Sequence, residues 1–196
     1  MKNKYKTREE YLQRAYSLLN EVAFKPNGQE CPPVNISCSW IIGNRTANKK
    51  TLGACSRRDA STGKINEIKI VPTVDDSFLA IDTLAHEMAH AVDDCQNGHR
   101  APFRKICLAV GLDGNSQMTY AEAGEKLGKT IKNIIATIGE YPHKAVIVGN
   151  AKKQSTRNLK VECNECDFSF RTSRKNVESM IHNHCLACDD GELELA

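Results

Sequence analysis

Residues 84–112 read LAHEMAHAVDDCQNGHRAPFRKICLAVGL and contain the pattern H-E-x-x-H at His86, Glu87 and His90. Two histidines four residues apart on a helix project from the same face, so their imidazoles can grip one zinc ion, and the glutamate after the first histidine lies beside the metal. A pattern with three fixed letters also arises by accident, and the helix face would then be a solvated one with two unrelated histidines. The pattern therefore needs support from its surroundings.

The surroundings of this pattern have helical periodicity. Asp75, Asp76 and Ser77 supply N-cap chemistry, and apolar residues then recur at intervals of three and four. These apolar residues are Leu79, Ile81, Leu84, Ala85, Met88, Val92 and Cys95. They would anchor one face of the helix by packing, which leaves His86 and His90 aimed consistently from the other face.

A catalytic zinc needs three protein ligands and one position open to water, so a third ligand must follow the pattern. His99 is the best candidate, because it comes directly after Gly98, where the helix would end and the chain could turn back toward the metal. Carboxylates also complete sites of this kind. The carboxylate rivals are Asp93, one turn beyond the second histidine, and Glu122 or Glu125 farther along the chain.

The same stretch resembles the core of the SprT-like, or Spartan-related, family of zinc metallopeptidases. The family pattern is H-E-x-x-H-A, a variable gap, Gly-His, a Pro-Phe pair and a following Gly-Leu. The matching positions are His90-Ala91, Gly98-His99, Pro102-Phe103 and Gly111-Leu112. Ala101 departs from the pattern, since a Gly often precedes the Pro, and we expect this change to affect loop flexibility more than metal ligation.

The resemblance implies roles for the site residues. It carries His86, His90 and His99 over as ligands of a catalytic zinc, and Glu87 as the general base. It also includes Met118-Thr119, Tyr141-Pro142-His143 and the C-terminal cysteines, so the chain looks most like small phage-encoded members with a zinc ribbon. One member of the family acts on DNA-bound proteins, and the expected substrate is therefore a nucleic-acid-associated protein.

The rest of the sequence predicts an α+β fold, and the resemblance implies that residues 1–142 form a zincin-like domain. Helices are expected over about 7–23, from about 76 until Gly98, from about 102 to 110 and over about 120–138. Alternating residues over 34–40, 52–56 and 67–71 predict three short strands in meander order, hence a small antiparallel sheet. Trp40 is expected in the core on the first strand. Tyr120 and His143 could act near the zinc, although packing is the simpler role for both.

Two C-x-x-C knuckles lie 18 residues apart near the C-terminus, at Cys163, Cys166, Cys185 and Cys188. This spacing is typical of a structural zinc held by four thiolates, and we expect a zinc ribbon over 159–190 behind a basic linker at 143–158. A domain this small needs its metal in order to fold. A redox pair of cysteines is the rival interpretation, and His182 or His184 could replace one thiolate ligand.

Basic residues concentrate in and before the ribbon, although the net charge is only +3. They are Lys152, Lys153, Arg157, Lys160, Arg171, Arg174 and Lys175, and they suit contacts with nucleic acid phosphates, with DNA as the expected partner. The alternative is that they solvate a small domain. Residues 189–194 would form an acidic tail, and the five other cysteines, Cys31, Cys38, Cys55, Cys95 and Cys107, are expected as small buried or half-buried thiols.

Localisation and function follow from these patterns as expectations. No stretch approaches the roughly 20 apolar residues that span a bilayer, and the N-terminus lacks an apolar signal region, so we expect a cytoplasmic protein without a membrane partner, in the host cell if phage-encoded. The expected function is zinc-dependent endopeptidase cleavage of a protein substrate, with one catalytic and one structural Zn²⁺. The alternative is a non-proteolytic, zinc-stabilised nucleic-acid-binding protein, for which Glu87 would have no use.

Overall fold

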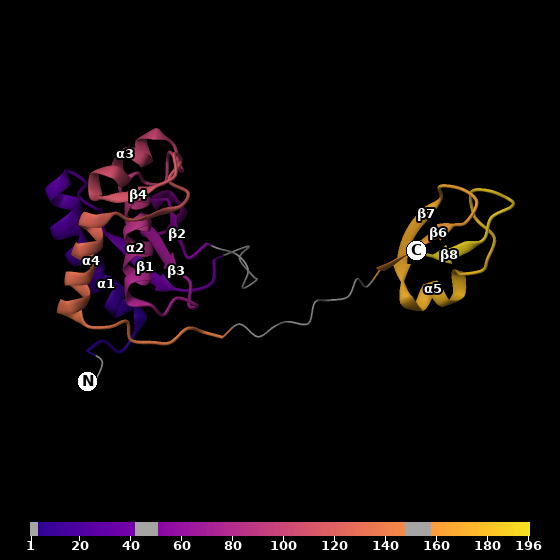
Figure 1. Cartoon of the computed structure of the whole chain (residues 1–196), viewed down its shortest axis with the longest axis horizontal. Helices are drawn as coiled ribbons and strands as arrows, with labels where there is room; N and C mark the ends of the chain where they lie inside the picture. Colours follow the sequence, from indigo (N-terminus) through magenta and orange to yellow (C-terminus); the bar gives the residue numbers. More distant parts are fainter. Residues whose placement is uncertain (1–3, 42–50, 148–157) are drawn as a thin grey trace. The chain divides into compact units, whose positions relative to one another are not determined.

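The computed structural model describes residues 4–41, 51–147 and 158–196. The chain forms a mixed α+β structure that divides into two compact units, Met1–Val148 and Gly149–Ala196 (Figure 1). Each unit has its own buried cluster of apolar side chains. Among the described residues, no helix is long and apolar enough to cross a membrane.

Four α-helices build most of the first unit. They are α1 (Arg8–Leu19), α2 (Ser77–Val92), α3 (Ala101–Val110) and α4 (Glu125–Ile138). A π-helical turn, η1 (Asn20–Phe24), and a 3₁₀ turn, η2 (Lys25–Asn27), extend α1, and a further 3₁₀ turn, η3 (Arg58–Ala60), follows the second strand. Thr7 and Glu10 form the expected capping box of α1, and the Asp76 side chain accepts a hydrogen bond from the amide of Leu79 at the start of α2.

The main sheet of the first unit is mixed, which corrects the predicted antiparallel meander. Its strands are β1 (Val34–Cys38), β2 (Gly53–Ser56) and β3 (Asn66–Ile70), in the order β1-β3-β2. β2 runs antiparallel to β3, whereas β1 runs parallel to it. Alternating side chains indicate which face of a strand is buried but not the direction of its neighbour, so the sequence pattern could not distinguish the two topologies.

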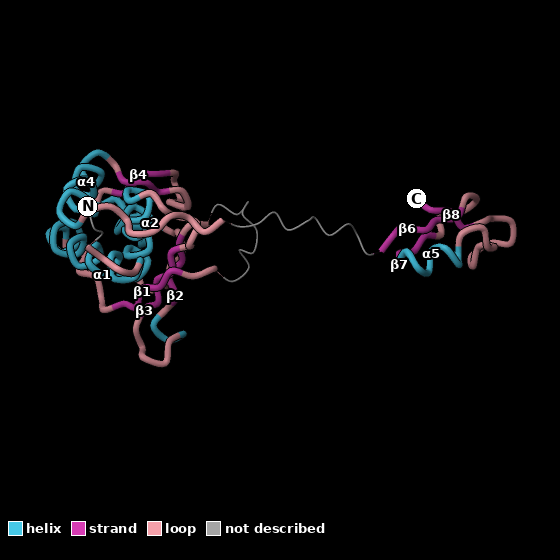
Figure 2. Tube along the Cα trace, turned by 90° about the horizontal axis from the view of Figure 1, so that it is seen from below, coloured by secondary structure: helices cyan, strands magenta, loops and turns pink. Residues whose placement is uncertain are grey.

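Helix α2 lies at the centre of the first unit. It contacts β2 and β3 on one side and α1, α3 and α4 on others, and the helices gather on one side of the sheet (Figures 1 and 2). Leu84, Ala85, Met88 and Ala89 are completely buried along it. The helix that carries H-E-x-x-H is therefore fixed by the core on several sides.

A short hairpin replaces the expected start of the last helix. Strands β4 (Leu112–Gly114) and β5 (Ala121–Ala123) pair antiparallel, and α4 begins only at Glu125. A Cβ atom on Gly114 would lie 2.0 Å from the carbonyl oxygen of Tyr120, so the close approach of these strands needs a glycine there. Strands of three residues are too short to leave a periodic signal in the sequence.

Two other predictions about the first unit are wrong. Trp40 lies beyond the end of β1, and 48% of its surface is exposed, so it is not a core residue. Residues 143–147, predicted as the start of a linker, are attached to the first unit: the amide of Val146 donates to the carbonyl of Pro72 at 2.9 Å, and Arg8 donates to the carbonyl of Lys144 at 2.6 Å. Most of the predicted linker, residues 148–157, lies outside the described residues.

The second unit is a small antiparallel sheet with one helix. It comprises β6 (Asn158–Cys163), β7 (Ser169–Ser173), α5 (Arg174–Met180) and β8 (Leu193–Leu195), with the strand order β7-β6-β8. Val161, Val177 and Leu193 form its apolar centre together with two of the cysteines. The predicted acidic tail is in fact part of the fold, since Leu193 is buried and pairs with Cys163 across the sheet.

Candidate metal centres

His86 and His90 lie one helical turn apart on α2, and both are half-buried. Glu87, between them in sequence, is only 5% exposed. The apolar side chains of α2 hold the helix in the core, so the direction of both imidazoles is set by packing, as the sequence predicts.

His99 reaches the same place from the loop that follows α2. This loop turns through three residues with positive φ, Asp94 (48°), Cys95 (53°) and Gly98 (54°). The amide of Cys95 donates to the carbonyl of His90 at 2.8 Å, which closes the end of the helix. The left-handed turns return the chain toward the helix face that carries the histidines.

The loop that bears His99 is fastened to the sheet through Asp94. One oxygen of this carboxylate accepts hydrogen bonds from the backbone amide of Arg58, at 3.0 Å, and from the buried amide side chain of Asn66 on β3, at 2.9 Å. The Arg58 guanidinium contacts the other oxygen at 3.3 Å. Asn66 also donates to the carbonyl of Ser56, so a single buried side chain ties β2, β3 and the loop together. The sequence gives no local signal for these long-range contacts.

The three imidazoles converge into one group. One ring nitrogen from each of His86, His90 and His99 lies within 4.8 Å of the other two, and the Nε2 atoms of His90 and His99 are 3.3 Å apart. The ring of Phe103 stacks on His90 with centroids 3.9 Å apart and an angle of 15°. The Pro-Phe element of α3 therefore forms a wall that holds an imidazole in place.

The rival carboxylates fall outside this group of three histidines. Asp93 is engaged by the Asn97 backbone amide, at 2.8 Å, and by its side-chain amide, at 2.6 Å. Glu122 lines the same cavity as the histidines, whereas Glu125 lies on α4 and is not among the residues that line it. Among the described residues, His99 is the side chain that completes the group.

The ionisable groups of this site are shifted toward their neutral forms. Burial, followed by the charge of His99, lowers the pKa of His86 to about 4, and burial with both neighbouring histidines lowers that of His90 to about 3. Burial also lowers the pKa of His99. Burial, with a smaller effect of the Cys95 thiol, raises the pKa of Glu87 to about 8. Neutral imidazoles are the form that ligates a metal ion.

The histidine group opens into a cavity of about 620 Å³. Its walls come from residues 51–55 on and before β2, from α2, from the loop with His99 and from residues 119–122. A Cβ atom on Gly53 would lie 2.7 Å from the Glu87 Oε1 atom and 2.8 Å from Thr83, so β2 can pass this close to Glu87 only because residue 53 is a glycine. Sequence reasoning missed Gly53, although a glycine inside a predicted strand is a recognisable sign of close approach.

Two of the scattered cysteines also line this cavity. Cys55 on β2 and Cys95 in the loop after α2 are half-buried, and their thiols interact directly. The hydrogen bond with Cys55 lowers the pKa of Cys95. Cys31 and Cys107 are buried as expected, and Cys38 contacts the Tyr141 hydroxyl at 3.1 Å.

The two further candidates from the sequence, His143 and Tyr120, differ in their position relative to the cavity. The Nε2 atom of His143 is 3.0 Å from the carbonyl oxygen of Lys6, on the N-terminal segment, and His143 is not among the residues that line the cavity. Tyr120 does line it and is 64% exposed. The contact of His143 with the N-terminal segment supports a structural role for this residue.

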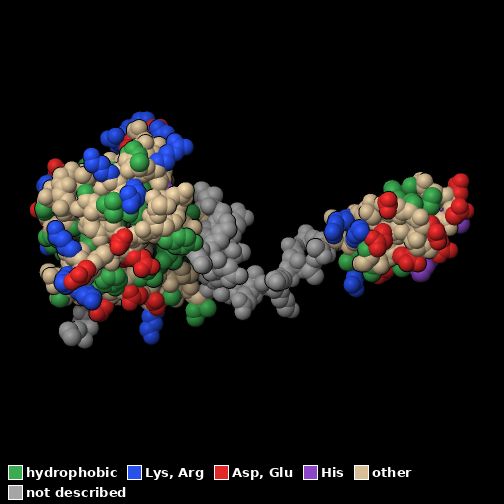
Figure 3. All heavy atoms as spheres, turned by 45° about the horizontal axis from the view of Figure 1, so that its top comes forward, with side chains coloured by type: hydrophobic (Ala, Val, Ile, Leu, Met, Phe, Trp, Pro, Cys, Tyr) green, Lys and Arg blue, Asp and Glu red, His purple; other side chains and the backbone are tan. Residues whose placement is uncertain are grey.

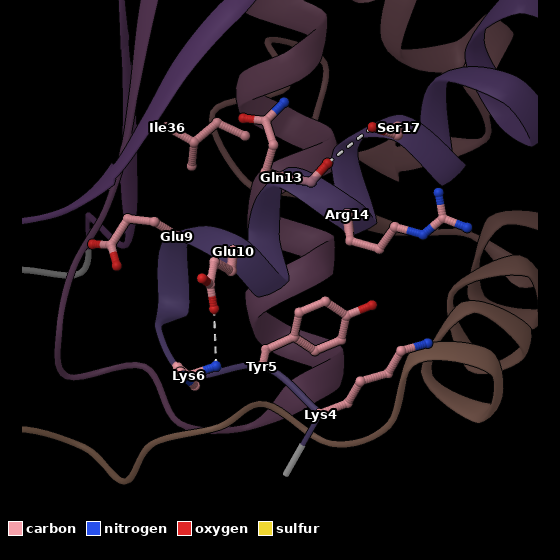
Figure 4. A pocket seen from close by; sticks show the side chains of 9 residues that line it. All are labelled: Lys4, Tyr5, Lys6, Glu9, Glu10, Gln13, Arg14, Ser17 and Ile36. Carbon is pink, nitrogen blue, oxygen red and sulfur yellow. Dashed lines mark hydrogen bonds between the residues drawn. The ribbon is translucent and has the colours of Figure 1, made fainter.

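A second hollow, of about 810 Å³, runs along the exposed face of α1 (Figure 4). Glu10 accepts a hydrogen bond from the amide of Lys6 at 2.9 Å, and Ser17 donates to the carbonyl of Gln13 at 3.1 Å. These polar groups form hydrogen bonds within α1 and at its N-terminal cap. The hollow therefore brings together no group of ligands comparable to the three histidines.

The four knuckle cysteines form the second candidate centre, in the second unit. Their sulfur atoms all lie within 4.8 Å of one another, with Cys163 and Cys188 3.7 Å apart and Cys166 and Cys185 also 3.7 Å apart. Backbone amides point at two of the sulfurs: Glu165 donates to Cys163, and Ala187 donates to Cys185, each at 3.3 Å. His182 and His184 are not part of this group. The arrangement fits a closed site for a single metal ion.

Glycine again makes a close approach possible at this centre. A Cβ atom on Gly191 would lie 2.2 Å from the Cys163 sulfur and 3.0 Å from the Cys188 sulfur. The amide of Cys185 donates to the Gly191 carbonyl at 2.8 Å, which links the second knuckle to the chain that leads into β8. Gly191 and β8 are thus part of the site, although they lie beyond the predicted end of the ribbon.

Basic side chains of the second unit gather near the start of β6 (Figure 3). Lys160 on β6 lies directly opposite Arg171 on β7, and the exposed Arg174 and Lys175 follow at the start of α5. Lys160 also pairs with Glu162 on its own strand. Lys152, Lys153 and Arg157 lie outside the described residues.

Comparisons with known proteins identify no relative of this chain, since no family model, no curated protein and no solved structure matches it.

Proposed function

We propose that the first unit is a zinc-dependent endopeptidase of the SprT-like, zincin kind. The observation that carries the proposal is the position of Glu87: a buried carboxyl group between two members of a three-histidine group, on the wall of an open cavity. A purely structural metal site needs no such carboxylate and no access for a substrate. The motif, its third histidine and the cavity fit one hydrolytic site.

The donor set fits zinc. Three imidazole nitrogens lie close together and favour their neutral form, and the two most buried histidines are held by helix packing and by Phe103. Three nitrogen ligands leave the fourth position of a tetrahedral ion free, as catalytic zinc requires. When bound, zinc would supply Lewis-acid polarisation of a peptide carbonyl and would lower the pKa of water.

Glu87 performs the proton transfers in this proposal. A cation held by the histidines would lower the pKa of Glu87, which is otherwise about 8, and would favour its carboxylate form. The carboxylate then accepts a proton from water and delivers it to the leaving amine. Gly53 leaves the Glu87 side chain room to do this while β2 covers it from one side.

β2 provides a place for an extended substrate. It forms one edge of the sheet β1-β3-β2, and in the described part of the chain it pairs only with β3. Residues 51–55 also line the cavity beside Glu87. An extended peptide that lay along this edge would place its backbone next to the histidines, which suits endopeptidase cleavage of a flexible protein segment.

We further propose that the second unit holds a structural zinc and contacts DNA. Lys160 and Arg171 lie opposite each other across the sheet; Lys160 already pairs with Glu162, but the exposed Arg171, Arg174 and Lys175 remain available for phosphates at the same end of the unit (Figure 3). Such contacts would bring nucleic-acid-associated proteins to the peptidase unit. A binding protein without proteolytic activity is the second candidate, favoured by the closed four-cysteine site and these basic residues alone.

The test compares the zinc-loaded protein with its Glu87→Gln variant on a flexible protein substrate such as casein. The amide has nearly the same shape as the carboxylate but cannot accept the proton, so cleavage should fall on the order of 10²- to 10⁴-fold while zinc content and circular dichroism stay unchanged. Glu125→Gln, an exposed carboxylate outside the cavity, is the matched control. Equal cleavage by Glu87→Gln and the parent would refute the role of Glu87.

A further inference from the structure

One buried carboxylate in the cavity has no role in the mechanism above. Asp82 lies on α2 one turn before His86, lines the cavity and is only 6% exposed. Its Oδ1 atom is buried and has no hydrogen-bond partner among the described residues. A buried polar oxygen without a partner is costly, so its place on the wall of a substrate cavity calls for a ligand.

The described surroundings of Asp82 offer its carboxyl group no cationic partner. The amide of Ala123 donates to the carboxylate, but the charged neighbour that acts on its pKa is a second carboxylate, Glu122 on β5. Burial, and to a smaller extent Glu122, raises the pKa of Asp82 to about 6 against the opposing effect of the Ala123 amide. Among the described residues, no Lys or Arg lines the cavity. Among the described residues, Asp82 thus has one amide donor and no cationic partner.

Apolar side chains line the same cavity as these carboxylates. Leu79 is 37% exposed and Tyr120 is 64% exposed, and both belong to its lining. An apolar wall beside a carboxylate suits a side chain with an aliphatic stem and a cationic end, which is the chemistry of Lys and Arg. An acidic or short polar side chain would gain from neither feature.

We propose that Asp82 and Glu122 form a substrate subsite that binds a Lys or Arg side chain, with its stem against Leu79 and Tyr120. The inference rests on the proposed peptidase function, because it assigns substrate specificity to the same cavity. A bound cation would supply the Asp82 carboxyl group with a charged partner and would offset the repulsion between the two carboxylates.

The first test maps cleavage sites. The zinc-loaded full chain is incubated with peptides from a digest that cuts only after Glu, so that internal Lys and Arg remain, and the new ends are identified by mass spectrometry. One position relative to the cleaved bond should be enriched in Lys and Arg. Asp82→Asn should reduce this preference by roughly 10- to 100-fold, the range of a hydrogen bond to a charged group. Glu125→Gln should leave it unchanged.

Glu122→Gln keeps the subsite testable if the Asp82 variant fails to fold. Glu122 is exposed, so its replacement should not disturb the core. It should reduce the preference in the same direction by a smaller factor. Cleavage by the parent protein without any cationic preference would overturn the subsite and leave the proposed function intact. The subsite is likewise overturned if both variants keep the preference of the parent.

A binding measurement decides the case in which no cleavage occurs. Zinc-loaded Glu87→Gln is titrated with two fluorescent casein-derived peptides that differ only by norleucine in place of each Lys. Tighter binding of the Lys peptide, abolished when Asp82→Asn is added, supports the subsite even if the peptidase function fails. Equal binding of the two peptides would overturn the subsite.

Discussion

The two candidate metal centres are built in opposite ways. The three histidines are attached to α2 and its loop, within a unit whose core includes large buried side chains such as Tyr11, Phe24 and Phe103. The four cysteines lie in a unit whose apolar centre consists of Val161, Val177 and Leu193. The first unit can stabilise itself by apolar burial and can thus hold a metal in an open, reactive position. The second has too little apolar surface for that, so a metal bound by its four cysteines would have to contribute to folding.

The largest expected effect is the loss of the second unit on metal removal. Binding of a structural zinc contributes on the order of 10 kcal/mol, more than the apolar centre of so small a unit can replace. EDTA should therefore abolish amide protection in β6, β7 and β8 while α2 remains protected, as measured by hydrogen exchange.

The same comparison predicts two zinc ions per chain. Cys163→Ser should reduce this number to one and unfold only the second unit, as measured by metal analysis and hydrogen exchange. Persistent protection of β6 in EDTA would show that the second unit folds without metal.

The second effect concerns the fastening of the His99 loop. Asp94→Ala removes the contacts with Arg58 and Asn66, which should let the loop move and weaken zinc binding at the histidine centre by about 10- to 100-fold. Competition with a chromogenic chelator measures this affinity. Asp59→Ala, which removes an exposed carboxylate paired with Arg57, is the control and should have no effect. An unchanged affinity in Asp94→Ala would mean that α2 alone fixes the site.

The third effect is the pH dependence of zinc binding at the histidine centre. In the metal-free protein the pKa of Glu87 is about 8, so Glu87 is protonated at neutral pH, whereas His86 and His90 have pKa values of about 4 and 3 and are already neutral. Zinc favours the carboxylate, so binding releases a proton and affinity rises with pH until about 8, by at most about tenfold per unit.

Above about pH 8 the affinity should be constant. Glu87→Gln should flatten the curve between about pH 6 and 8, as measured by the same chelator competition at each pH. A parent protein with a flat curve in this window would contradict the raised pKa of Glu87.

The smallest effect is expected for single charges on the second unit. Arg171→Ala with Arg174→Ala should weaken DNA binding and reduce the slope of log affinity against log salt by about one for each phosphate that is no longer neutralised. Fluorescence anisotropy at several salt concentrations measures the slope. Lys126→Ala with Lys132→Ala, two exposed charges on α4, removes the same charge from the first unit and should not change it. Equal slopes in both double variants would assign the DNA-binding surface elsewhere.

The sequence predicted those parts of the molecule that depend on local spacing. His86 and His90 are one turn apart on any helix, and each C-x-x-C knuckle brings two sulfurs together through a short turn, so both groups were expected and both converge. His99 needed the additional inference that Gly98 turns the chain back. The direction of β1, the exposed position of Trp40 and the hairpin β4-β5 depend on contacts between distant residues, which leave no periodic trace.

The environment of the candidate site was predicted less well for the same reason. Asn66 fastens the His99 loop from a strand about 30 residues earlier, and Asp82 meets Ala123 from another element altogether. Neither residue stands out in sequence, since a polar residue on a helix or strand is ordinarily solvated. Only the fold shows that both are buried.

The close approach of Gly53 to Glu87 suggests a criterion for judging other chains that carry H-E-x-x-H. In the proposed mechanism, a side chain at position 53 would displace the Glu87 carboxyl group, so such a chain could keep its three histidines and lose its base. An intact motif would then hide an inactive enzyme. If the proposed function holds, a glycine in the strand that passes over the glutamate is a marker of activity that the motif itself does not contain.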